Sequence, residues 1–238
     1  MKKENKILII SGTHGDERIT EAIIKLLKKT DITDKFESII GNPKAWSAKK
    51  RLIDVDLNRC YPGKKTSDKY EENIAYKNLM LTKKYSVVID LHEANKSKDD
   101  FIVIPKSNLS DKKLISYISI NNIVLWPSTS KRRTGPITQF INKSFELEIG
   151  TQNINKNEKV KKIAKILNNF ITNYYNKKEL FKNKKIFLVY DKLMTEKKSA
   201  EEKIVDFKKT KIINETFYPL LSNQYITNGI VCYKMKLL

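Results

Sequence analysis

The sequence predicts an α/β domain followed by a small β region. A short apolar run leads through a glycine-containing loop into an amphipathic stretch, which is the strand–loop–helix opening of an α/β unit. Further apolar runs and amphipathic stretches follow up to about residue 175. Beyond residue 184, short strand-like runs succeed one another without helices between them. We therefore expect an α/β domain over residues 1–178 and a C-terminal β region over residues 179–238, and we expect this region to cap the functional site of the first domain.

The first elements are marked by apolar runs and by their breakers. Residues 6–11 (KILIIS) predict a buried strand that is closed by Gly12. Residues 21–29 predict a helix with lysines at its end, where the helix dipole favours them. A second strand over residues 36–40 is broken by Gly41-Asn42-Pro43. Residues 44–69 have no usable periodicity, which predicts a long loop of functional importance.

The later elements follow from the same patterns. Residues 68–85 predict a helix, and residues 86–91 form a nearly continuous apolar run that is typical of a strand in the centre of a sheet. The remaining expected elements are strands at 101–105, 122–126 and 145–149, helices at 111–117 and 160–175, and C-terminal strands at 186–190, 203–207, 212–213 and 229–235.

Composition narrows the class of protein. The chain has 238 residues, of which 40% are hydrophobic and 31% are charged, so it can bury a core of ordinary globular type. It has neither a long apolar run nor a signal-type N-terminus, and we expect a cytoplasmic protein that does not enter a membrane. Cys60 and Cys232 stand far apart and outside any CxxC pattern, which indicates neither a disulfide framework nor a thiolate metal site.

The formal net charge of +20 could indicate a polyanionic partner. However, 42 of the 47 basic residues are lysines that are spread over the whole length. Nucleic-acid sites concentrate arginine, aromatic residues or a basic stripe, and the sequence shows no such element. We therefore expect weak attraction to anions but no specific nucleic-acid binding.

The only two histidines each stand beside a carboxylate at the end of a strand-like run. His14 and Glu17 are three residues apart, directly after the first strand, so both could face one ion. His92 ends the central run. Two imidazoles and one carboxylate, with water in the fourth position, are a ligand set of catalytic zinc. The alternatives are an ordinary loop histidine with a helix-terminal glutamate, and a capped strand end.

Three further carboxylates accompany these histidines. Asp90 points to the same side of its strand as His92, where it either orients the imidazole or is a satisfied buried residue. Glu146 and Glu148 share one face of their strand, and either could be the general base that a zinc site needs. Spacing alone does not choose between them.

Five motifs follow one another along the chain: Gly12-Thr13-His14-Gly15-Asp16-Glu17, Gly41-Asn42-Pro43, Asp56-Leu57-Asn58-Arg59 followed by Pro62-Gly63, Asp90-Leu91-His92, and Leu147-Glu148-Ile149-Gly150 with Gln152. Their order resembles the succinylglutamate desuccinylase and aspartoacylase family, which is similar to the zinc carboxypeptidases. The resemblance covers about residues 6–152, and five motifs in order are more specific than any one alone. Residues 217–221 and 229–233 resemble the family's C-terminal β region more loosely.

The resemblance implies a mixed β-sheet flanked by helices and one zinc ion per chain. His14, Glu17 and His92 would hold the zinc, which leaves a position open for water. The family's catalytic glutamate stands before a hydrophobic residue and glycine, which selects Glu148 as the general base. Glu146 is then expected to shape the pocket or to pair with a lysine.

Arginine is rare in this lysine-rich chain, and two of the five arginines match the family's motifs. Arg51 resembles the residue that stabilises the oxyanion. Asn58 and Arg59 resemble the pair that holds the substrate's carboxylate. Tyr225 resembles a tyrosine of the C-terminal region that reaches the pocket. Arg18 is expected to lie at a solvated helix start.

One departure from the family concerns the acyl group. In aspartoacylase an arginine near the catalytic glutamate reads the acidic part of the substrate, but alignment back from Glu148 places Thr138 there. Two alternatives follow: either Arg132 or Arg133 substitutes for this arginine, or the acyl group is not acidic.

The sequence thus predicts a zinc-dependent amidohydrolase that cleaves the amide bond of a small N-acyl amino acid. One alternative is a zinc carboxypeptidase that acts on short peptides with the same metal and the same Arg59. A second alternative, from a different class, is a non-catalytic basic protein that keeps the fold and binds an anion or a nucleic acid. A homo-oligomer is compatible with either class.

Overall fold

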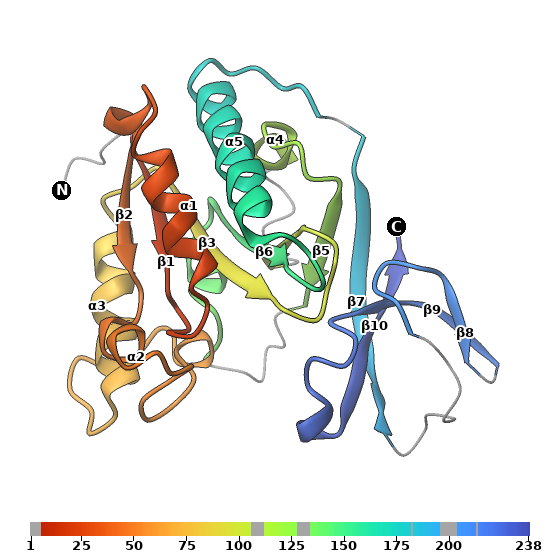
Figure 1. Cartoon of the computed structure of the whole chain (residues 1–238). Coiled ribbons are helices and arrows are strands. Elements are labelled where there is room, and N and C mark those ends of the chain that lie inside the picture. Colours follow the sequence, from red (N-terminus) through yellow and green to blue (C-terminus); the bar gives the residue numbers. More distant parts are fainter. Residues whose placement is uncertain (1–5, 106–111, 128–133, 182, 196–203, 213) are drawn as a thin grey trace.

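A computed structural model describes residues 6–105, 112–127, 134–181, 183–195, 204–212 and 214–238 (Figure 1). In this part of the chain, ten strands form one sheet in the order β2-β1-β3-β6-β4-β5-β7-β10-β9-β8. The strands are β1 Ile7–Ser11, β2 Phe36–Ile40, β3 Val87–Ala94, β4 Phe101–Pro105, β5 Asn122–Trp126, β6 Ser144–Gly150, β7 Lys185–Met194, β8 Thr210–Ile212, β9 Glu215–Leu220 and β10 Ile230–Leu237. The helices are α1 Ile19–Leu27, α2 Pro43–Ala48, α3 Tyr70–Thr82, α4 Lys112–Ser116 and α5 Lys156–Tyr175.

The sheet is mixed, as predicted. β2, β1, β3 and β6 run parallel to one another, β4 runs antiparallel to β6, and β5 and β7 are parallel to β4. β10 and β9 continue the sheet as antiparallel strands, with β8 at the edge. The C-terminal strands therefore extend the same sheet through the β5–β7 pair, while the division at residue 178 stays a prediction.

The two faces of the sheet separate its core from its site. On one face, alternate residues of β1 and β3 such as Ile7, Ile9 and Ile89 pack in a core with α1, α4 and α5 (Figure 1). On the other face, Leu8 and Val88 pack against α3. This alternation is the period of two that strand geometry imposes. It leaves the polar side chains of β3 and β6 on the α3 side.

Most expected elements are present, with shifted ends. β3 continues two residues beyond His92, so this histidine lies inside the strand and not at its end. α5 begins four residues before the expected start, where the Asn155 side chain accepts hydrogen bonds from two backbone N–H groups of its first turn.

Two expectations in the irregular segments were wrong. The loop over residues 44–69 contains the six-residue helix α2, which begins where Asn42 caps it and Pro43 occupies its first position. Residues 204–207 form no strand, and the edge of the C-terminal region is made by β8, close to the strand expected at 212–213, and by β9, which overlaps residues 217–221 of the more loosely resembling β region.

Candidate metal centre and active site

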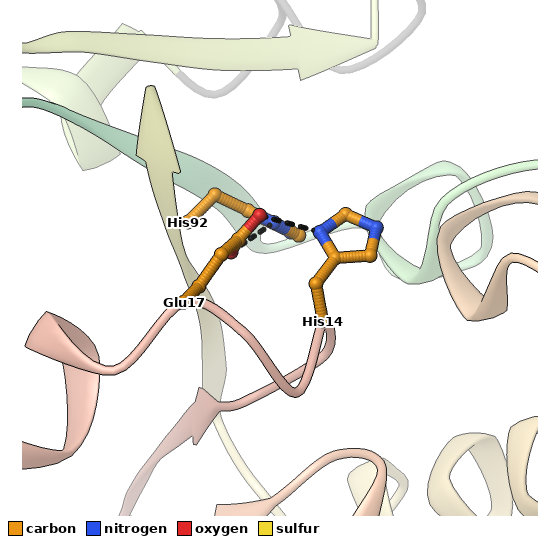
Figure 2. Close-up of side chains that lie close together, drawn as sticks. All are labelled: His14, Glu17 and His92. Atoms are coloured by element: carbon orange, nitrogen blue, oxygen red, sulfur yellow. Dashed lines mark hydrogen bonds and ion pairs between the residues drawn. The ribbon is translucent and has the colours of Figure 1, made fainter. Parts of the chain in front are cut away.

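Two segments bring the predicted metal ligands together. β1 delivers the chain into a tight loop in which the Glu17 N–H donates to the His14 carbonyl, and this turn places both side chains on one side. β3, which pairs with β1, presents His92 beside them. All three side chains are buried. Figure 2 shows the Glu17 carboxylate between the two imidazole rings.

The ligand atoms converge. His14 Nδ1 lies 2.6 Å from Glu17 Oε1, and His92 Nδ1 lies 3.2 Å from Glu17 Oε2. One ligand atom from each residue lies within 4.8 Å of the other two. Glu17 precedes α1 and does not lie within it, so the loop turn and not a helical turn sets the spacing.

The outer ring nitrogens also face carboxylates. His14 Nε2 lies 3.0 Å from Asp56 Oδ1, and His92 Nε2 lies 3.2 Å from Asp90 Oδ2. Asp90 is fully buried, and its other oxygen accepts a hydrogen bond from the Thr13 hydroxyl. The prediction that Asp90 shares a side with His92 is confirmed. Metal-binding histidines typically direct their second nitrogen to a carboxylate in this way.

Charge pairing dominates the electrostatics of this cluster. Burial lowers the pKa of His14, but the carboxylates of Glu17 and Asp56 outweigh burial and raise it. Burial would raise the pKa of Glu17, whereas the two imidazoles hold it well below its usual range. A buried, ionised carboxylate between two imidazole nitrogens is therefore the preferred state of the site.

This donor set fits a zinc ion. Two imidazole nitrogens and a carboxylate oxygen are zinc ligands, and each imidazole already has a carboxylate on its far side. The buried His92 Nε2 and Asp90 Oδ2 approach each other without hydrogen-bond geometry. A cation that draws the inner nitrogen of His92 would change the orientation of that ring.

Glu148 lies next to the cluster on the neighbouring strand. The register of β3 and β6 pairs His92 with Glu148 and Asp90 with Glu146. Glu148 is half-buried, and burial raises its pKa to about 7, with His92 opposing this change. A carboxyl group with a pKa near neutrality can both accept and return a proton.

Glu146 is occupied by other groups. It is buried, Thr138 Oγ1 donates to its Oε1 at 2.7 Å, and Asn58 Nδ2 approaches its Oε2 at 3.4 Å. Of the two roles expected for Glu146, the structure shows no pairing with a lysine among the described residues, since its carboxylate contacts a hydroxyl and an amide. Glu146 therefore contacts Asn58, a candidate substrate-binding residue.

Arg51 lies at the edge of the metal cluster. Its Nη2 donates to Asp56 Oδ2 at 3.1 Å, and its Nη1 lies 3.8 Å from Glu17 Oε1. Burial lowers the pKa of Arg51, while Asp56 and Glu17 outweigh burial and raise it. The guanidinium is thus a permanent cation beside the candidate ligands, and a cation in such a place can stabilise an oxyanion.

The Asp56-Leu57-Asn58-Arg59 motif forms a short helical turn. The 3-10 helix Leu57–Arg59 is capped by Asp56, whose Oδ1 accepts from the Asn58 N–H at 2.9 Å. Asn58 is buried, whereas the Arg59 side chain is exposed and its Nη1 donates to the Asn58 carbonyl. The turn therefore places one buried amide and one solvent-facing guanidinium at the site.

The C-terminal region contributes Tyr225. This half-buried tyrosine precedes the 3-10 helix Ile226–Asn228 and packs against Tyr233 of β10 at a ring distance of 6.1 Å. Burial raises the pKa of Tyr225 and Glu148 adds to this effect, while Arg59 and Arg51 oppose it. The phenol therefore lies within electrostatic reach of three candidate site residues.

The other predicted polar residues lie elsewhere or cannot be placed. Arg18 is exposed, as expected, but it also stacks on the Trp46 ring with its Cζ 3.4 Å from the ring centroid. Thr138, at the position of the family's arginine, is fully buried against Glu146. Arg132 and Arg133 lie outside the described residues.

Two residues that were given no role from the sequence support the site. Asp56 contacts His14, Arg51 and the Asn58 backbone. Glu71, fully buried at the start of α3, accepts from the backbone N–H groups of residues 53–55 and from the Asn42 side chain. Asp56 could have been noticed beside Asn58, whereas Glu71 carries no sequence signal beyond its place in a first helical turn.

Comparisons with known proteins agree with the fold and the motifs. Residues 3–174 match the model of the succinylglutamate desuccinylase/aspartoacylase catalytic domain. A probable aspartoacylase from Trichodesmium erythraeum is 27% identical over 233 residues, which cover 89% of this chain and 76% of that protein. A probable aspartoacylase from Nostoc is 31% identical over 166 residues, which cover 63% of this chain and 56% of that protein.

Solved structures show the same fold over the whole chain. Murine aminoacylase 3 has a TM-score of 0.76 at 15% identity, and the match covers 100% of this chain and 97% of that one. The succinylglutamate desuccinylase from Chromobacterium violaceum has a TM-score of 0.72 at 15% identity, with 100% and 86% covered. Because the family model spans well over half of the sequence, this chain belongs to the succinylglutamate desuccinylase/aspartoacylase family of amidohydrolases.

Proposed function

We propose that this chain is a zinc-dependent amidohydrolase that cleaves a small N-acyl amino acid. The observation that carries the proposal is the convergence of His14, Glu17 and His92, with Glu148 beside His92 in the sheet. Family membership supports amide hydrolysis, since the relatives named above include probable aspartoacylases. The geometry adds a ligand set that suits zinc and a general base adjacent to it.

In this proposal His14, Glu17 and His92 hold the metal. When bound, zinc supplies a Lewis acid that polarises the scissile carbonyl and acidifies water. Glu148 takes a proton from the attacking water and delivers it to the leaving nitrogen. Its pKa of about 7 suits both directions of transfer.

The remaining residues bind and orient. Arg51 donates to the oxygen that gains negative charge during attack, and its partner Asp56 holds the guanidinium in place. Asn58 and Arg59 hold the free carboxylate of the substrate, the amide from a buried position and the guanidinium from the solvent side. Tyr225 closes the pocket from the C-terminal region.

The test is a hydrolysis screen on purified protein of known metal content. Acetyl, succinyl and longer acyl amino acids are compared with dipeptides that carry the same C-terminal residue. We expect one zinc per chain and hydrolysis of acyl amino acids. Faster cleavage of dipeptides would favour a carboxypeptidase, whereas substoichiometric zinc and no activity after metal addition would favour a non-catalytic binder.

Two glutamate variants test the general base. Glu148→Gln should lower kcat by about 10²- to 10⁴-fold, because it removes the proton acceptor and leaves the metal ligands intact. Glu146→Gln is the matched control, since the residue lies on the same strand face but contacts Thr138 and Asn58. We expect both variants to keep the zinc content of the wild type. A larger loss of kcat in Glu146→Gln would reverse the assignment of the base.

A further inference from the structure

We propose that Asp56 is a positioning residue that couples the metal side of the site to its substrate side. The inference rests on the proposed function and goes beyond it, because it assigns a task to a residue that neither binds the metal nor touches the substrate. It stands on three contacts of one side chain. Asp56 Oδ1 lies 3.0 Å from His14 Nε2 and accepts from the Asn58 N–H at 2.9 Å, while Oδ2 accepts from Arg51 Nη2 at 3.1 Å.

The two carboxylate oxygens of Asp56 have different partners. Oδ1 holds the outer nitrogen of a metal ligand and caps the turn that carries Asn58 and Arg59. Oδ2 holds the guanidinium of Arg51. The Asp56 carbonyl also accepts from the Arg59 N–H at 2.9 Å, so the backbone of the turn is anchored at the same residue.

Asp90 is the natural comparison for Asp56, because it contacts a histidine of the metal cluster but no candidate substrate-binding group. It lies 3.2 Å from the outer nitrogen of His92, but its other oxygen accepts from Thr13, which has no proposed part in the reaction. Asp90 is fully buried within β3, whereas the Asp56 side chain is 24% exposed in the loop. Each aspartate therefore faces the outer ring nitrogen of a histidine, but only Asp56 is within hydrogen-bond geometry of it and also contacts groups on the substrate side.

The guanidinium of Arg51 depends on Asp56 for its place. Its two carboxylate neighbours are Asp56 at 3.1 Å and Glu17 at 3.8 Å, and only the contact with Asp56 is a hydrogen bond. An oxyanion-binding group loses effectiveness when its orientation is not preorganised. We therefore expect the loss of Oδ2 to reduce catalysis without releasing the metal.

Two substitutions separate these tasks. Asp56→Asn retains one oxygen that can accept from His14 Nε2–H and from the Asn58 N–H, but it directs an NH2 group at Arg51. It should keep zinc affinity within about threefold of the wild type and lower kcat/KM by about 10- to 100-fold. Asp56→Ala removes all three contacts and should lower zinc affinity as well, by about 10- to 100-fold.

Zinc affinity is measured by competition with a chelator, and kcat and KM are measured on the zinc-loaded enzyme. The matched control is Asp54→Asn, since Asp54 lies two residues earlier and accepts from the Tyr70 N–H. We expect it to change neither quantity by more than about threefold. A cycle with Arg51→Ala adds a direct test of coupling: Asp56→Asn should cost little in kcat/KM once Arg51 is absent.

Distinct results would overturn the inference. It is wrong if Asp56→Asn loses zinc as fully as Asp56→Ala does, or if it leaves the kcat/KM of an active enzyme unchanged. It is also wrong if Asp56→Ala binds zinc like the wild type. If the wild type hydrolyses no acyl amino acid or peptide, the proposed function fails, and the zinc affinity of Asp56→Ala still decides the contact with His14.

Discussion

The candidate site is assembled from a sheet side and a loop side that are held in different ways. The sheet side consists of His92, Glu146 and Glu148 on β3 and β6. The loop side consists of residues 12–17 and 49–60, which carry His14, Glu17, Arg51 and the Asp56–Arg59 turn. On the sheet side, backbone pairing sets which residues are neighbours, because the β3–β6 register places His92 beside Glu148.

The loop side has no ladder and depends on polar side chains. Glu71 accepts hydrogen bonds from three consecutive backbone N–H groups of the loop, and Asp56 contacts both His14 and Arg51. The Gly15 N–H donates to the Arg51 carbonyl, which brings the two loops into contact. Backbone pairing thus fixes the neighbours on the sheet side, whereas the loop side is organised by the carboxylates of Glu71 and Asp56 and by the contact between Gly15 and Arg51.

Replacing either histidine should have the largest effect on zinc binding. The effect on the free energy of unfolding should differ between His92 on the sheet side and His14 on the loop side. His14→Ala and His92→Ala should both abolish stoichiometric zinc binding, because each removes one of three protein ligands. His92→Ala should also lower the free energy of unfolding of the metal-free protein by about 1–3 kcal/mol, since it leaves the fully buried Asp90 without its imidazole.

Metal analysis and urea denaturation provide these measurements. His14→Ala is the matched comparison, because its partner Asp56 retains Arg51 and is partly exposed. A variant that keeps one zinc per chain would exclude its histidine from the ligand set.

Removing Glu71 should damage the loop side alone. Glu71→Ala leaves the N–H groups of residues 53–55 without their acceptor and should lower the free energy of unfolding by about 3 kcal/mol. It should also reduce kcat/KM, because the released segment connects Arg51 to Asp56. Glu72→Ala is the control, since Glu72 binds Lys64 and Ser67 near the surface. Equal losses in both variants would contradict this role of Glu71.

The pH dependence of stability gives a second measure of Glu71. Burial raises its pKa, but the backbone N–H groups and Asn42 outweigh burial and hold it below the ordinary value of 4.5. A carboxyl group with a lowered pKa stabilises the folded state above the unfolded pKa, and this contribution is lost as the pH falls through the folded pKa. The stability difference between wild type and Glu71→Gln should therefore shrink below pH 4.5. A difference that grows on acidification would contradict the direction of the shift.

A methyl group added at Gly15 should disturb the contact between the two loops, with a smaller effect than the loss of Glu71. A Cβ there would lie 2.2 Å from the carbonyl oxygen of Ala45 and 2.4 Å from that of Lys50, and backbone atoms cannot move aside cheaply. Gly15→Ala should cost about 1–3 kcal/mol of stability and lower zinc affinity, because His14 is the adjacent residue. Thermal unfolding and chelator competition measure both effects. An unchanged zinc affinity would show that the loops adjust independently of each other.

The smallest effect is expected for the hydroxyl of Tyr225. Tyr225→Phe keeps the ring that packs against Tyr233 but removes the hydroxyl, which lies within electrostatic reach of Glu148, Arg51 and Arg59, so stability should hold and KM should rise by about three- to tenfold. Tyr218→Phe, in β9, is the control. An unchanged KM would show that the Tyr225 hydroxyl does not contribute to substrate binding.

The agreement between sequence and structure differs between these sides. His92, Asp90 and the pair Glu146 and Glu148 could be placed from strand period alone, because alternate residues share a face. The prediction that His14 and Glu17 lie on one side is confirmed, although a loop turn and not a helix brings them together, and their binding of one ion stays a prediction. The helix α2 was missed because six residues carry too little periodicity, even though Asn42-Pro43 is a helix-start signal.

What the sequence determined by itself was local: the order of the main strands and helices, the faces of β3 and β6, and the set of residues capable of zinc chemistry. These follow from periodicity and spacing over a few residues. Only the tertiary structure decided how the loops are held, since Asp56 meets His14 across 42 positions and Glu71 meets Ile53 across 18. Contacts over such separations depend on how helices and loops pack against the sheet, and no local pattern encodes them.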